Sequence, residues 1–98
     1  MASLALEAFI DESIRLSREH GCHPTVFIGM RLRYQTVPAI SRLVVSGEIQ
    51  SGFKRLKELG LLDWTIEAAV TRFPEEFSHE VRQASEWRLR QARGDQIA

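Results

Sequence analysis

The fold depends on one ten-residue stretch, TVFIGMRLRY, which covers residues 25–34. With a period of two, its apolar side chains alternate with the remaining ones as they do in a β-strand. With the helical period, Phe27, Met30 and Tyr34 share one face. The rest of the chain has helical spacing, so a lone strand would lack a partner for its backbone hydrogen bonds. The sequence therefore predicts a helix over residues 25–34.

Helices are also predicted on both sides of this stretch. A first helix has an apolar face and ends at Gly21, and Pro24 opens the next one, because proline is tolerated in a first turn. A third helix is expected to start with Thr36 as its cap and to end at Gly47. The inward faces expected here are Leu6, Phe9, Ile10, Ser13 and Leu16 in the first helix, and Ile40, Leu43 and Val44 in the third.

The second half of the chain predicts three more helices. The fourth runs from about residue 50 to 59, and Gly60 is expected in the left-handed conformation that closes a Schellman motif. The fifth is expected to begin at an Asp63 cap and to end at Pro74, and the sixth to begin at a Ser78 cap. Their expected inward faces are Phe53, Leu56 and Leu59; Ile66, Ala69, Val70 and Phe73; and Val81, Ala84, Ser85, Arg88, Leu89 and Ala92.

These elements predict an all-α fold, a compact single-domain bundle of about six short helices. The 98 residues are too few to divide into two hydrophobic cores. Helices of two or three turns do not persist alone in water, so each depends on packing against the others. We expect the helical domain to span residues 1–93 and residues 94–98 to form a frayed C-terminal tail.

Composition limits the classes of function. Thirteen Lys and Arg balance thirteen Asp and Glu, whereas a protein that binds nucleic acid usually has an uncompensated basic face. No apolar run approaches the roughly 20 residues of a membrane span, and acidic residues near the N-terminus do not suit a signal peptide. The single cysteine, Cys22, is consistent with a reducing compartment. We therefore expect a cytoplasmic protein without a membrane partner.

One polar corner is a candidate for metal or nucleophilic chemistry. It contains His20, Cys22 and His23, and His79 could join them if the last helix folds back. The spacing matches no usual zinc pattern, and no oxyanion hole, phosphate loop or Ser-His-Asp order accompanies it. A helix-ending turn explains these residues better, so we expect no cofactor and no catalytic residue.

A basic set of residues raises the alternative of DNA binding. Residues 36–59 have the outline of a helix-turn-helix, and residues 52–62 faintly resemble the second helix of a winged regulator. No hairpin wing follows, and equal acidic charge offsets the basic side chains. Trp64 stands at a helix end, where a tryptophan can anchor a protein partner. The candidate residues for binding a partner or nucleic acid are Arg31, Arg33, Arg42, Lys54, Lys57 and Trp64.

Three residues sit where their type is unfavourable. Gly29 lies inside a helix, where it costs about 1 kcal/mol relative to alanine, so we expect it to permit a close helix–helix approach, within the domain in preference to a dimer. Glu67 and Arg88 lie on or beside apolar stripes, where an unpaired charge is costly. We expect these two to form a partly buried ion pair, with a structural role favoured over ligand binding.

A longer residue pattern runs through most of the chain. Its members are Pro24-Thr25, Phe27, Met30, Ala39, Leu43-Val44, Gln50-Ser51-Gly52-Phe53, Arg55-Leu56, Glu58-Leu59-Gly60, Leu62-Asp63, Thr65, Glu67, Phe77, Ser78, Glu80, Ala84 and Arg88-Leu89. With this pattern the chain resembles a functionally uncharacterised bacterial all-helical module. The resemblance implies a helix over residues 25–34 and brings no activity. The module has glycine in the turn where this chain has Gln35-Thr36, which leaves the geometry of that corner open.

The sequence thus favours a non-enzymatic helical protein–protein interaction module, bacterial and cytoplasmic, with a homodimer as one form. Arginine outnumbers lysine eleven to two, which suits paired charges and protein contacts. Six short helices also resemble death-fold adaptors at the level of fold alone. The alternatives are a DNA-binding regulator that uses residues 36–59 and, third, a small metal-binding or Cys/His enzyme.

Overall fold

The helical interpretation of residues 25–34 is confirmed. A computed structural model describes residues 2–46 and 51–97, and within these ranges the chain forms six α-helices, two short 3-10 helices and no strand. The helices are α1 (Leu4–Glu19), α2 (Thr25–Tyr34), α3 (Thr36–Val45), α4 (Ser51–Glu58), α5 (Ile66–Arg72) and α6 (His79–Ile97); the 3-10 helices are η1 (Leu62–Trp64) and η2 (Pro74–Glu76).

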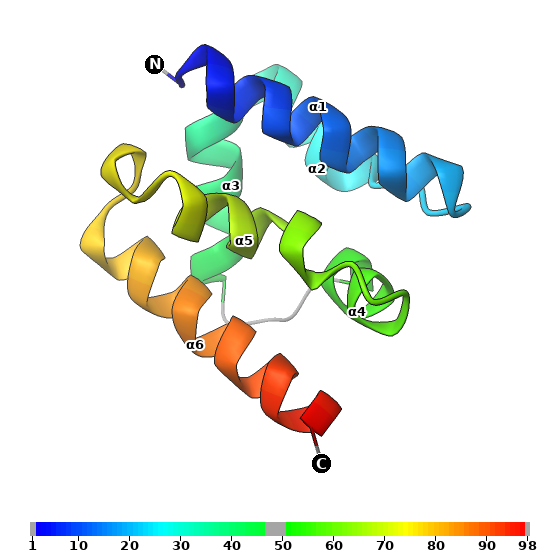
Figure 1. Cartoon of the computed structure of the whole chain (residues 1–98). Helices are drawn as coiled ribbons and strands as arrows, with labels where there is room; N and C mark the ends of the chain where they lie inside the picture. The colour runs from blue at the N-terminus through cyan, green and yellow to red at the C-terminus, as the bar shows by residue number, and fades with distance from the viewer. Residues whose placement is uncertain (1, 47–50, 98) are drawn as a thin grey trace.

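The helices cross one another around a shared interior. Figure 1 shows α1 and α6 on opposite sides of the molecule, with α3 and α5 between them and α2 beside α1. The closest packing joins α5 to α6, α2 to α3 and α3 to α6. The Cα radius of gyration is 12.4 Å, close to the about 13 Å expected for a compact domain of 100 residues. The chain is therefore one compact all-α domain.

The core contains side chains from α1, α2, α3, α5 and α6. Leu6, Ile10, Ile40 and Val70 are fully buried or nearly so. A second, smaller cluster joins α4 and η1 to the end of α6 through Phe53, Leu62, Leu89 and Ala92. All of these except Leu62 are positions that the helical period predicted to face inward, so the apolar spacing identified most of the interior.

Local signals explain several helix ends. The Ser3 hydroxyl accepts a hydrogen bond from the Leu6 amide and caps α1. Gly21 has a φ of 80°, which is accessible to glycine and ends this helix as expected. The Leu61 amide donates to the Leu56 carbonyl at 2.8 Å after Gly60, whose φ is 75°. This is the Schellman motif that the sequence predicted.

Of the two caps predicted for the second half of the chain, one differs from the structure and one is confirmed. Asp63 is not the cap of the fifth helix, because residues 62–64 form η1 and Thr65 takes that role, accepting a hydrogen bond from the Ala68 amide at 3.1 Å. At the sixth helix the Ser78 hydroxyl accepts a hydrogen bond from Val81 at 3.3 Å, which confirms that cap. Apolar packing of Leu62 and Trp64 adds a short turn that local propensity does not reveal.

The corner between α2 and α3 also differs. Thr36 is the first residue of α3 and does not cap it, since its hydroxyl instead bonds to Glu7 and Arg31. The residue before α3 is Gln35, with φ of 74° and ψ of 174°, a region that is populated essentially by glycine. The resemblance to the helical module left this corner open, and the structure places a strained glutamine there.

The remaining boundaries follow the sequence less closely. The predicted start of the fourth helix at residue 50 and the predicted stop at Gly47 lie outside the described residues. Helix α6 continues through Gly94 to Ile97, past the end expected at residue 93. In the described part of the chain, no helix has both the length and the apolar character needed to cross a bilayer.

Candidate functional site

The predicted metal corner does not assemble. His20 and His23 are exposed, and His79 begins α6 on the side of the molecule away from the corner between α1 and α2 (Figure 1). Among the described residues no three His, Cys, Asp or Glu side chains lie close enough together to hold a metal ion. Cys22 instead faces Arg55, and hydrogen bonding to Cys22 and to Glu58 raises the pKa of that guanidinium.

Arg31, the first of the predicted basic binding residues, has a structural role. Arg31 donates to Asp11 at 2.8 Å and to Glu7 at 3.2 Å, and it also donates to the Thr36 hydroxyl at 3.0 Å. It therefore links α1, α2 and the start of α3, with only 19% of its side chain exposed. A residue held by this many partners is unavailable for phosphate contacts.

The other four basic candidates lie in two places. Arg33 and Arg42 both approach the Tyr34 ring, with guanidinium carbons 6.0 Å and 4.1 Å from its centroid. Lys54 and Lys57 belong to α4, which Figure 1 shows well apart from the start of α3. The structure does not bring the predicted set together on one helix-turn-helix face.

Trp64 is partly buried, and its role as a partner anchor stays a prediction. Trp64 stacks on Phe9 with ring centroids 4.9 Å apart, and its carbonyl accepts a hydrogen bond from Ser13. Trp87 on α6 has 55% of its surface exposed instead. The contacts with Phe9 and Ser13 therefore place Trp64 at the packing of α1 on η1.

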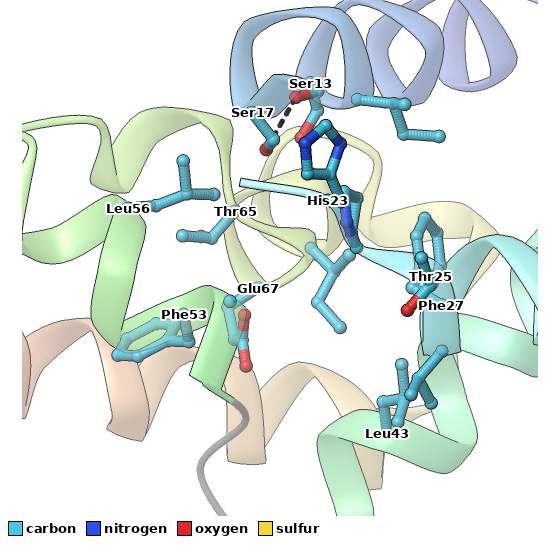
Figure 2. A pocket seen from close by; sticks show the side chains of 15 residues that line it. Ser13, Ser17, His23, Thr25, Phe27, Leu43, Phe53, Leu56, Thr65 and Glu67 are labelled. Atoms are coloured by element: carbon cyan, nitrogen blue, oxygen red, sulfur yellow. Dashed lines mark hydrogen bonds between the residues drawn. The ribbon is translucent and has the colours of Figure 1, made fainter. Parts of the chain in front are cut away.

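A cavity of about 190 Å³ opens where α1, α2, α3, α4 and α5 approach one another. Figure 2 shows Phe27, Leu43, Phe53 and Leu56 among its apolar walls, with His23 near the Ser13 and Ser17 side. These residues come from separate helices, so no sequence spacing could have grouped them. His23, considered above as a metal ligand, lies at this cavity.

Glu67 is the charged residue in the cavity wall, and it pairs with Arg88. The Arg88 Nη1 atom lies 3.0 Å from the Glu67 Oε2 atom, and the two side chains are only 5% and 1% exposed. Arg88 also lies 3.4 Å from the Leu43 carbonyl oxygen. The predicted ion pair is confirmed, and it is more deeply buried than expected.

Two buried polar atoms lack a hydrogen-bond partner among the described residues, Glu67 Oε1 and Ser85 Oγ. Burial raises the pKa of the Glu67 carboxyl above its ordinary value, although hydrogen bonds from Arg88 and from the residue's own backbone amide oppose the shift. Sequence reasoning identified the pair from its position on apolar stripes. It could not show that one carboxylate oxygen would remain unsatisfied beside a cavity.

The raised pKa of Glu67 predicts how stability depends on pH. The folded chain holds this proton more tightly than the unfolded chain, so the stabilisation is complete below the unfolded-state pKa and is lost as pH rises through the folded-state pKa. Lowering the pH from about 7 to about 4 should therefore stabilise the wild type relative to Glu67→Gln. Urea unfolding of both proteins across this range measures the difference; a difference that is constant or grows with pH would contradict the shift.

Comparisons with known proteins assign no role to this site. No family model, curated protein or solved structure matches this chain.

Proposed function

We propose that the chain is a non-enzymatic helical interaction module that associates with a second copy of itself through α2. The observation that carries this proposal is the outward face of α2. Val26 is 68% exposed and Leu32 is 83% exposed, and within the helix only Phe27 is buried. Apolar side chains gathered on one exposed helix face are typical of interaction surfaces.

Gly29 lies between these two residues and supports a contact from outside. A Cβ atom built on Gly29 would meet no atom within 4 Å, so the glycine serves no close approach within the domain. The expectation of an internal contact is therefore wrong. Residues three apart on a helix are neighbours, so Val26, Gly29 and Leu32 form one oblique exposed stripe with a gap at its centre.

A second copy fits this stripe because Gly29 leaves a space at its centre and the Leu32 side chain projects from its end. In a two-fold arrangement, Leu32 of each copy can enter the space above Gly29 of the other, as an isologous interface requires. An antiparallel crossing also separates the two Arg33 side chains, which follow Leu32. The formal net charge of +0 means that two copies do not repel each other as a whole.

The proposed location of the module is the bacterial cytoplasm, because a single cysteine is consistent with a reducing compartment. The DNA-binding alternative stays a prediction without a structural observation in its favour, since Arg31 is engaged with Glu7 and Asp11. The absence of a shared basic face in the described residues also favours a protein partner over a phosphate backbone.

Replacing Leu32 by glutamate should weaken self-association at least about tenfold, because each copy would place a charge where burial of a leucine contributes about 1.5–3 kcal/mol. Sedimentation equilibrium over a range of concentrations measures the dissociation constant. Leu4→Glu is the matched control, since Leu4 is 90% exposed on α1 and outside the stripe. A wild-type chain that stays monomeric at millimolar concentration, or equal losses in the two variants, would overturn the proposal.

A further inference from the structure

The cavity described above shares Val26 with the α2 stripe, and it has an unsatisfied group of its own. Its volume of about 190 Å³ exceeds the about 150 Å³ of an engineered protein cavity that binds benzene. Phe27, Leu43, Phe53, Leu56 and Ile66 supply apolar walls. The dimensions therefore suit a substituted single ring or a small fused ring.

The buried hydroxyls around the cavity already have partners. Ser17 donates to the Ser13 carbonyl at 3.0 Å, and the Ser13 hydroxyl donates to the Trp64 carbonyl. Thr65 donates to the Leu62 carbonyl at 2.8 Å and accepts from Ala68. None of these three hydroxyls needs a ligand to complete its hydrogen bonding.

Glu67 differs from them. Its Oε2 atom accepts from Arg88, while its Oε1 atom is buried without a partner among the described residues. The side chain lies between Phe53 of α4 and Leu43 of α3 (Figure 2). A buried acceptor without a donor is costly, so a ligand that supplies one donor at this point would gain more than its apolar surface alone provides.

We propose that this cavity binds a neutral, mainly apolar molecule of one or two fused rings that donates a single N–H or O–H to Glu67 Oε1. The ligand is neutral because Arg88 already balances the Glu67 charge, so an ammonium group would enter the cavity uncompensated. Glu67 is only 1% exposed, so the ligand has to part the flanking Phe53 and Leu43 side chains to reach it. Because these side chains have to move, we expect modest affinity. Because Glu67 Oε1 lacks a partner among the described residues, we expect strong selectivity for ligands that carry the N–H or O–H donor.

Indole and benzofuran test the proposal on the wild-type chain. They have nearly the same shape, and benzofuran replaces the N–H donor of indole with an acceptor oxygen. Titration followed by amide NMR shifts should show indole binding at least about tenfold more tightly, with shifts at Glu67 and Phe53. Equal affinities, or no binding of either compound up to its solubility limit, would overturn the proposal.

Glu67→Gln tests the role of the named oxygen. Arg88 requires an acceptor, so the amide oxygen should face Arg88 and the amide NH₂ should take the place of Oε1. The preference for indole should then disappear or reverse in favour of benzofuran, which accepts hydrogen bonds. Glu80→Gln is the matched control on exposed α6 surface and should keep the wild-type ratio. Retention of that ratio in Glu67→Gln would contradict the assignment.

Discussion

Arg88→Ala is expected to lower the free energy of unfolding by about 3–5 kcal/mol. The substitution leaves Glu67, which is 1% exposed, as a buried carboxylate whose nearest cation has been removed. It also removes the long side chain that joins α6 to α5 and approaches the Leu43 carbonyl of α3. The loss therefore combines an unpaired charge with lost packing, and denaturant unfolding at neutral pH measures it.

Two further variants separate the charge from the packing. Arg88→Met retains most of the volume but still strands Glu67, so it should also be destabilised. The double variant Glu67→Leu/Arg88→Met removes both charges, and its stability should return to the wild-type value or exceed it, because apolar replacements of buried ion pairs are often neutral or stabilising. If Arg88→Met and Arg88→Ala both unfold like the wild type, the pairing is unimportant for stability.

Gln35→Gly is expected to raise the free energy of unfolding by about 1 kcal/mol. A non-glycine residue in the backbone region of Gln35 costs about 1–3 kcal/mol, of which the greater freedom of glycine in the unfolded chain offsets about 0.5–1 kcal/mol. The Gln35 amide donates to Arg31 at 2.9 Å and its carbonyl accepts from Ala39 at 3.1 Å, and glycine keeps both backbone bonds. Thermal or denaturant unfolding measures the gain.

Gln35→Ala is the control for this prediction. Alanine has the same Cβ atom as glutamine and meets the same steric restriction, so it should bring no comparable gain. The Gln35 side chain is exposed, so its truncation removes little packing. Equal stabilisation by alanine and glycine would show that the side chain, and not the backbone strain, limits stability at this corner.

Local features of the sequence predicted the elements of the fold. Residues 25–34 fit both the helical period and the period of a strand, and helix was the choice because no neighbouring segment could pair with a strand. Gly21 and Gly60 end helices because their positive φ values suit glycine. The Glu67–Arg88 pair was also predictable, since a charge on an apolar stripe needs a partner from another such stripe.

Features that depend on contacts between helices were not predictable in the same way. Arg31 belongs to a basic run in the sequence, and only the neighbouring α1 shows that Glu7 and Asp11 engage it. Trp64 stands at a helix end in the sequence, and only the tertiary structure shows that it stacks on Phe9. Each of these outcomes requires knowing which helix faces meet, and that information is spread over distant residues.

The amino-acid sequence alone determined that this chain is a single all-α domain, because the period of apolar side chains and the positions of glycine and proline act over a few residues. The tertiary structure decided where function can reside. It left Val26, Gly29 and Leu32 of α2 uncovered and placed Glu67 in the wall of a cavity between five helices. The physical reason is that exposure and hydrogen-bond satisfaction depend on the packing of distant segments, which no local pattern encodes.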